Sequence, residues 1–248
     1  MKKIIKRSLA LVMALVLSVT AFSFVPVSAE EDDYSPVSWY PAVTSSTKTY
    51  TGKNGNKIIA NTYFERAVIT GFQKGISKIN KATKKMAKSF DPSNLHSTAK
   101  EVAELSDYSK EIFYDCVNMD VSYYDSKYIS MVSTEHWYAG GVSNDISVGY
   151  VYDLNTGKKK TITQVTGLSE KKIKSKLVDA IKGDEEFKDY IDEFAPQIEA
   201  MVNATKIKDI SFAIDIDGRV FVLIPPYTEP LYGGWTRFYF LDGVTVAE

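Results

Sequence analysis

Short hairpins constrain the fold of this chain more than any other feature. The clearest is DISFAIDIDGRVFVLIPP, residues 209–226, in which an Asp-Gly pair supplies turn chemistry between two apolar strands. Residues 111–124 and 128–138 predict a second pair of strands. Residues 145–153 continue the alternation, and a turn at residues 155–157 predicts a further hairpin with KKKTIT, residues 158–163. Antiparallel strands can be joined by such short turns, whereas parallel strands need long crossovers. The pattern therefore predicts an antiparallel sheet.

Helical periodicity occurs in separate blocks between these strands. One block has apolar or small residues at the spacing of a single helix face: Phe72, Ile76, Ile79, Thr83, Met86 and Phe90. Its other positions are rich in lysine, which suits either an anionic surface or, as we favour, a solvated face. Residues 170–183 and 184–202 predict two more helices, the first with Ser169 as a candidate N-cap. We therefore predict an α+β fold, an antiparallel sheet built from hairpins with helices packed on it.

The N-terminus has the layout of a secretory signal peptide over residues 1–29. A basic start precedes an apolar run at residues 9–25, and Val27-Ser28-Ala29 supplies small residues for cleavage. The alternative is an uncleaved anchor, because the apolar run approaches the roughly 18 residues that span a bilayer. Residues 30–48 are acidic and then rich in Ser, Thr and Pro, so we expect a flexible linker. We expect the mature protein to be secreted to the bacterial cell envelope, without membrane contact.

The charge of the mature chain excludes some classes of partner. Cleavage after residue 29 removes four of the 30 basic residues and none of the 31 acidic ones, which leaves 26 against 31, a formal charge of −5. That balance argues against nucleic acid as a partner. We expect two parts: residues 49–110, a strand with the lysine-rich helix, and residues 111–248, a larger α+β domain.

The chain is poor in residues for metal or nucleophilic chemistry. It has two histidines and one cysteine, without clustered ligand spacing, so we expect no metal and no cofactor. Glu135 and His136 are adjacent on a predicted strand and should point to opposite faces. Cys116, in IFYDCVNMD, is interpreted as a small half-buried strand residue. A triad through His136 and a pair of carboxylates stay open as alternatives, but no motif marks either. We expect no enzymatic activity.

The candidate binding residues are aromatic side chains beside tight turns. Flat aromatic faces near loops suit sugar rings or a protein partner, although they can equally close the ends of a sheet as part of its core. The glycine pairs in the same stretches permit positive φ. The candidates are Trp137, Tyr138, Gly140, Gly141, Tyr227, Pro230, Tyr232 and Trp235.

Two blocks of the sequence resemble a known family. YISMVSTEHWYAGGVSNDISVGYVYDLNTGKKKTITQV, residues 128–165, is similar to the central block of the RsiV-like domain of unknown function. DGRVFVLIPPYTEPLYGGWTRFYF, residues 217–240, is similar to its closing block, and the ISKINKATKKM helix resembles its usual upstream partner domain. The resemblance covers about residues 50–242.

The resemblance implies an exported α+β domain that binds at the cell wall. Such domains occur in the extracytoplasmic part of the lysozyme-sensing anti-sigma factor RsiV and beside peptidoglycan deacetylase domains. We see no cytoplasmic segment before the apolar run and no deacetylase domain after residue 248, so we expect neither sigma-factor control nor an appended catalyst. Relatives often have a histidine after the Gly-Gly turn, where this chain has Val142 and Ser143. We expect a non-enzymatic module that contacts wall glycan or a secreted protein such as lysozyme. The alternatives are a carboxylate-dependent peptidoglycan hydrolase and a lysozyme inhibitor.

Overall fold

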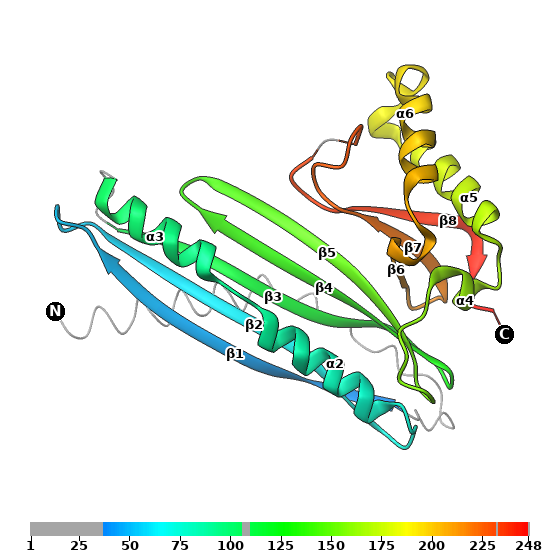
Figure 1. The fold of residues 1–248 in the computed structure, drawn as a ribbon, viewed down its shortest axis with the longest axis horizontal. Helices are drawn as coiled ribbons and strands as arrows, with labels where there is room; N and C mark the ends of the chain where they lie inside the picture. The colour runs from blue at the N-terminus through cyan, green and yellow to red at the C-terminus, as the bar shows by residue number, and fades with distance from the viewer. Residues whose placement is uncertain (1–36, 106–109, 232, 248) are drawn as a thin grey trace. The chain divides into compact units, whose positions relative to one another are not determined.

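The computed structural model describes residues 37–105, 110–231 and 233–247, which belong to one compact unit, residues 36–248. The predicted signal peptide and residues 30–36 lie outside the described residues. Two sheets form the fold, one of five strands and one of three (Figure 1). With the helices between them, they confirm the predicted α+β class. Within the described ranges, no helix has the length and apolar character needed to cross a membrane.

The larger sheet has the strand order β1-β2-β3-β4-β5. These strands are β1 (Val37–Thr51), β2 (Lys57–Gly71), β3 (Lys110–Tyr124), β4 (Tyr128–Ala139) and β5 (Val142–Asp153). All neighbours are antiparallel except β2 and β3, which are parallel. Two helices, α2 (Ile76–Ser89) and α3 (Ser93–Leu105), lie between those two strands in the sequence. A parallel pair requires such a long crossover, so the sheet is not built from hairpins alone.

Two predicted boundaries differ from this sheet. Residues 37–48, predicted as part of a flexible linker, form most of β1 and pair with β2 along its whole length. β1 is an edge strand whose side chains are mostly exposed, so it lacks the apolar alternation that marks a half-buried strand. The boundary predicted at residue 110 does not separate two sheets, because β2 pairs with β3 across it.

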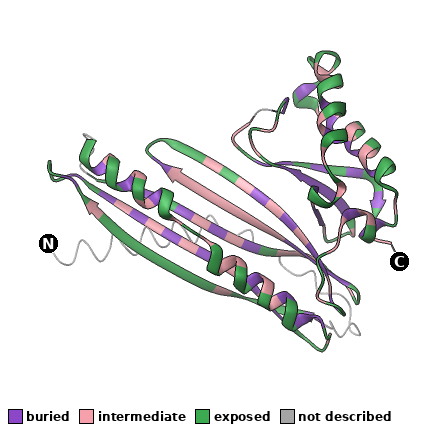
Figure 2. Cartoon of the chain, viewed as in Figure 1, coloured by how far each residue is buried: buried purple, intermediate pink, exposed green. Residues whose placement is uncertain are grey.

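Helices α2 and α3 bury their apolar faces against the five-stranded sheet. Ile76 and Ile79 of α2 pack in a cluster with strand residues such as Ile69. α3 adds Leu95, Ala99 and Ala103 to a second cluster around Phe113 of β3. Figure 2 shows buried positions alternating with intermediate ones along β2, and buried and exposed positions along the two helices. Phe72, predicted on the buried face of the first helix, is 83% exposed because the helix begins only at Ile76.

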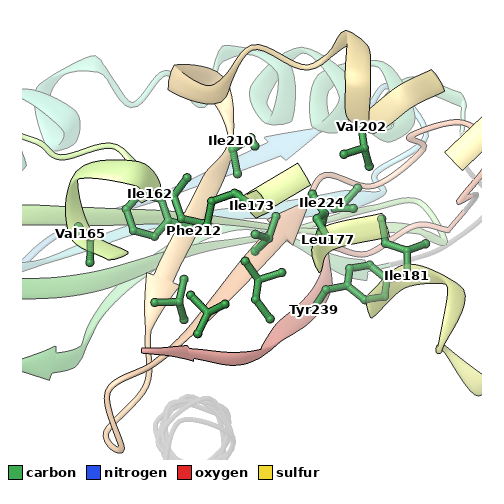
Figure 3. Close-up of a cluster of buried hydrophobic side chains, with 14 of the residues drawn as sticks. Ile162, Val165, Ile173, Leu177, Ile181, Val202, Ile210, Phe212, Ile224 and Tyr239 are labelled. Atoms are coloured by element: carbon green, nitrogen blue, oxygen red, sulfur yellow. The ribbon is translucent and has the colours of Figure 1, made fainter. Parts of the chain in front are cut away.

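The smaller sheet carries the largest core of the protein. It contains β6 (Ser211–Ile214), β7 (Arg219–Ile224) and β8 (Arg237–Thr245), in that order. The helical segments around it are α4 (Ile162–Thr166), α5 (Glu170–Lys182), α6 (Ile191–Ala204) and two short 3₁₀ turns, Glu185–Phe187 and Ile207–Asp209. Ser169 caps α5 as its sequence predicts. Figure 3 shows helix side chains such as Ile173 and Leu177 meeting Phe212 and Tyr239 of the sheet.

The segment KKKTIT, residues 158–163, does not form the strand that its position after a turn suggests. Only Lys159 bridges back to Tyr152. The following residues instead form α4, which starts at a reciprocal cap between Thr161 and Gln164. This S/T-x-x-E/Q type of cap satisfies the first free N–H groups of a helix, and it outweighs the weak strand pattern.

Short side chains let the two sheets approach each other. A Cβ on Gly149 of β5 would lie only 2.1 Å from the carbonyl oxygen of Phe212 in β6, so only glycine fits there. The Gly149 N–H donates to Ser211 Oγ at 2.9 Å, and the Ile214 N–H donates to Ser130 Oγ of β4 at 2.9 Å. These bonds fix β6 against β4 and β5, and so position the loop that follows β7.

Candidate functional site

The end of the β4–β5 hairpin is shaped by a glycine pair. Gly140 and Gly141 have φ values of 59° and 85°, and they connect the paired residues Ala139 and Val142. Two left-handed residues in a two-residue hairpin loop form a turn that matches the strand twist and that only residues such as glycine adopt easily. The predicted conformational role of this pair is confirmed. Gly233 and Gly234 are not among the positive-φ glycines.

The loop after β7 runs along the outer edge of β5. The Asp145 N–H donates to the Gly234 carbonyl at 3.2 Å, and the Thr236 N–H donates back to the Asp145 carbonyl at 3.0 Å. Thr236 Oγ1 then accepts from the Ser147 N–H at 2.7 Å. These contacts bring a predicted aromatic loop, residues 225–236, next to the predicted aromatic hairpin. Because the hairpin and the loop are far apart in the sequence, the sequence alone did not predict that they are neighbours.

Tyr227 is held in an uncommon backbone conformation where this loop meets β5. Its φ is 58°, the left-handed region, which costs a non-glycine residue about 1–2 kcal/mol. Its N–H donates to the Gly233 carbonyl at 2.9 Å, and its hydroxyl donates to Asn144 Oδ1 at 2.5 Å. Such outliers persist where surrounding contacts fix them, and they concentrate at binding sites. This one aims the phenol at Asn144, near the start of β5.

A cavity of about 220 Å³ opens beside this contact. Trp137 pairs with Asn144 across the hairpin, and Glu135 pairs with Ile146, so these four side chains lie on one face of the sheet. Together with Asn94 of α3, they line the cavity. Drug-sized ligands occupy pockets of about 300 Å³ or more. This cavity therefore suits a single ring or one side chain rather than a large molecule.

A buried carboxyl group lies next to Trp137. Asp115 of β3 is the register partner of Trp137 in β4, and only 4% of it is exposed. Burial raises the pKa of the Asp115 carboxyl to about 7, and the negative charge of Glu135 adds to the shift. Asp115 can therefore donate as well as accept a hydrogen bond near neutral pH.

Two buried polar atoms at this position have no hydrogen-bond partner within the described part of the chain. They are Oδ1 of Asp115 and the indole Nε1 of Trp137. Buried polar atoms are nearly always bonded, so each exception needs an explanation. Here an acceptor and a donor lie on paired positions of neighbouring strands, and the Trp137 side chain also lines the cavity.

The structure places Tyr138 and His136 away from this cavity. Tyr138 stacks on Tyr114 with ring centroids 5.5 Å apart, and its hydroxyl donates to Glu111 at 3.0 Å. His136 Nδ1 lies 2.7 Å from Asp145 Oδ1. Since neighbouring residues of a strand point to opposite faces, the predicted divergence of Glu135 and His136 is present.

The remaining candidates from the loop have different positions. Pro230 follows a cis peptide bond and is buried beside Leu231, which is 2% exposed, so it anchors the loop. Tyr232 lies outside the described residues. Trp235 is 53% exposed and bridges to Asp145, one residue beyond Asn144. The structure thus joins Trp137 and Tyr227 through Asn144, with Trp235 nearby.

The single cysteine has a structural position. Cys116 is half-buried in β3, as predicted, and burial next to Asp115 raises its pKa to about 11. A thiol of that kind is a poor nucleophile near neutral pH. Across the described ranges, no group of three or more His, Cys, Asp or Glu side chains is arranged to hold a metal ion.

The sequence interpretation missed Asp115, Asn144, Asn94 and Ile146. Asp115 could have been found from the sequence, because it occupies a core-facing position of β3 between the core-facing residues Phe113 and Val117. A carboxyl group at a core position is rarely fully buried without a partner or a function. Asn94 and Ile146 carry no such signal, since they reach the cavity only through tertiary packing.

Comparisons with known proteins bear on the fold alone. No protein family model matches the sequence, and no curated protein matches it. The similar solved structures include a DUF3298 family protein from Pseudomonas aeruginosa PAO1, with 10% identity and a TM-score of 0.49, and a DUF3298 family member from Bacteroides fragilis NCTC 9343, with 8% identity and a TM-score of 0.54. Each alignment covers 86% of this chain and 95% of the other. The structural neighbours are thus DUF3298 proteins, the domain family that includes the RsiV-like domains.

Proposed function

We propose that the protein is a non-enzymatic binding module of the bacterial cell envelope, and that it binds one sugar ring of the cell-wall glycan in the Trp137 cavity. One observation carries the proposal. The indole N–H of Trp137 and the Oδ1 atom of Asp115 are buried without partners at the same level of adjacent strands, beside a cavity of about 220 Å³.

The other groups around the cavity fit a sugar better than an apolar ligand. Asn94 and Asn144 provide amides that can both donate and accept hydrogen bonds. The flat indole of Trp137 offers a surface on which the apolar side of a sugar ring can lie. Tyr227 holds the Asn144 amide from the outside through its 2.5 Å hydrogen bond, which limits the rotation of that group. The site thus combines one aromatic plane with a few fixed polar groups, the usual composition of a small-ligand site.

The test is calorimetric titration of the purified protein with muropeptides and with N-acetylglucosamine oligomers. Trp137→Phe keeps an aromatic plane but removes the N–H, and should weaken binding roughly tenfold, the effect of about one hydrogen bond. Tyr227→Phe releases Asn144 and should weaken it by a smaller factor. Trp39→Phe is the matched control, because Trp39 is a 39% exposed tryptophan on β1. The proposal fails if no glycan binds, or if the control loses as much affinity as the cavity variants.

A secreted protein such as lysozyme is the competing partner in the same experiment. Titration with lysozyme, together with an assay of lysozyme activity on cell walls, separates the two. Lysozyme binding that survives Trp137→Phe, in the absence of glycan binding, would place the interaction elsewhere. Reduced lysozyme activity would favour the inhibitor alternative.

One observation favours a second candidate function, a carboxylate-dependent peptidoglycan hydrolase. The pKa of Asp115 is raised to about 7, and Glu135 lies nearby on the next strand. A carboxylic acid that keeps its proton near neutral pH beside a second carboxyl group is the arrangement that glycoside hydrolysis uses. Release of soluble muropeptides from purified peptidoglycan, lost in Asp115→Asn and in Glu135→Gln, would establish this function. Absence of release from the intact protein would eliminate it.

A further inference from the structure

The outer face of α2 carries a straight row of lysines. Successive lysines of this row, from Lys74 to Lys88, are four, three, four and three residues apart, so they follow one stripe of the helix surface. The stripe points away from the buried face formed by Ile76, Ile79 and Thr83. At a rise of 1.5 Å per residue, its helical part from Lys78 to Lys88 is about 15 Å long, and Lys74 precedes the first residue of the helix. We call this row the lysine stripe: Lys74, Lys78, Lys81, Lys85 and Lys88, all exposed.

The charges of the stripe are not compensated within the described part of the chain. The α2 sequence, ISKINKATKKMAKS, contains no acidic residue, and none of the stripe lysines forms an ion pair there. The Lys78 ammonium donates only to the backbone carbonyl of Thr156, at 3.2 Å. Helix α5 differs, because there Lys174 pairs with Glu170 and Lys182 pairs with Glu199.

Folding brings further positive charge beside the start of the stripe. The Gly75 N–H donates to the Leu154 carbonyl at 2.8 Å, and a Cβ on Gly75 would lie 2.3 Å from the Gly157 nitrogen. The backbones of the two segments are therefore in contact, although they are about 80 residues apart. The residues after Gly157 are Lys158 and Lys159, both exposed. The basic surface thus combines α2 with a second, distant segment.

This arrangement opposes the stability of the helix. Like charges four residues apart repel each other, and positive charge near a helix N-terminus, as at Lys78, is unfavourable to the helix dipole. The chain as a whole has a formal charge of −1, so the stripe does not follow from a basic composition. A local arrangement that breaks the stability rules without an internal compensating contact points to a partner outside the chain.

We propose that the lysine stripe binds a linear polyanion with phosphodiester repeats that is not a nucleic acid. Each lysine is a compact point charge suited to phosphate, and a row of them matches a chain with phosphates along its length. A bilayer fits less well, because a helix that lies in a membrane inserts its apolar face, and the apolar face of α2 is buried in the protein core. This inference concerns a different surface from the Trp137 cavity and does not depend on the proposed function.

The test measures binding of the purified protein to poly(glycerol phosphate) chains by calorimetry at 50 and 200 mM salt. With five lysines engaged and a slope of about −0.7 per charge, affinity should fall roughly 100-fold over that range. The triple variant Lys78→Gln, Lys81→Gln, Lys85→Gln should bind much more weakly at 50 mM salt and show only a roughly sevenfold salt effect. The control, Lys171→Gln, Lys172→Gln, Lys208→Gln, removes three exposed lysines elsewhere and should bind like the unmodified protein.

Several results would overturn the proposal. These are no binding of the polymer at 50 mM salt, equal losses in the stripe and control variants, or binding to anionic phospholipid vesicles in place of the polymer. Thermal unfolding of both triple variants checks that they fold. The stripe variant should unfold at the same or a higher temperature, because the substitutions remove repulsion. Glycan binding by the Trp137 cavity should be unchanged in it, so failure of one proposal is distinguishable from failure of the other.

Discussion

Asp115→Asn should make the protein more stable at neutral pH. It should also remove the part of the pH dependence of the unfolding free energy that comes from the Asp115 carboxyl group. The pKa of the Asp115 carboxyl is raised from 3.8 to about 7 by burial and by Glu135. Between those two values the folded protein keeps a proton that the unfolded chain has lost. Stability contributed by this group is therefore present below pH 4 and falls as the pH rises towards 7, above which it stays constant. Asparagine has nearly the same shape and no charge to desolvate.

The size of the effect follows from the shift. At 1.36 kcal/mol per pKa unit, the rise in the Asp115 pKa from 3.8 to about 7 corresponds to about 4 kcal/mol at its upper limit. Relaxation and water penetration reduce such values for real sites, and we expect about 2–4 kcal/mol between pH 4 and pH 7.5. This is a large fraction of the 5–15 kcal/mol that typically separates folded and unfolded states.

The assay is urea unfolding followed by tryptophan fluorescence at a series of pH values from 4 to 8. The difference in unfolding free energy between Asp115→Asn and the unmodified protein should be near zero at pH 4 and grow in favour of the variant up to about pH 7. The control Asp209→Asn replaces an exposed carboxylate that forms no ion pair with the described residues, and it should give a difference that is small at every pH. A constant difference, or an unmodified protein that is the more stable at pH 8, would refute the assigned environment of Asp115.

Three further predictions test other parts of the structure. Gly141→Ala should cost about 1–2 kcal/mol in urea unfolding, because alanine would have to adopt a φ of 85°. Gly149→Ala should cost more, about 3 kcal/mol or higher, since its Cβ would lie 2.1 Å from the carbonyl oxygen of Phe212 and force the sheets apart. Cys116, whose pKa is raised to about 11, should react with a disulfide reagent at pH 8 far more slowly in the folded protein than in urea. Equal thiol rates in the two states would contradict its burial.

The elements that sequence predicted well are those fixed by local chemistry. The hairpin strands β3 and β4, the Gly140-Gly141 turn and the Ser169 cap of α5 depend on residues within a few positions of each other. The edge strand β1 was mistaken for a linker because its exposed side chains carry no burial pattern. The parallel pairing of β2 and β3 depends on how α2 and α3 pack, which no local pattern encodes.

In the candidate site, too, the features that depend on local sequence were predicted and those that depend on tertiary packing were not. Trp137 stood out because it precedes a tight turn, and Tyr227 because it lies in a loop rich in proline and glycine. Their connection through Asn144 joins residues 83 positions apart, so no local rule could supply it. Asp115 carried a readable signal, an acid in the buried phase of a strand, but sequence alone could not show that its neighbour on β4 would be Trp137.

Local rules are broken at two positions around the cavity, and both violations reduce stability. Asp115 keeps a carboxyl group in the core, and Tyr227 keeps a left-handed backbone. Natural chains that tolerate such costs usually do so where the residues bind or react. The Asp115→Asn variant separates a functional carboxyl group from a merely tolerated one. If the carboxyl only fills space, Asp115→Asn raises stability and leaves glycan affinity unchanged. If it contacts the ligand, the same substitution raises stability at pH 7 and lowers affinity, so the two measurements move in opposite directions.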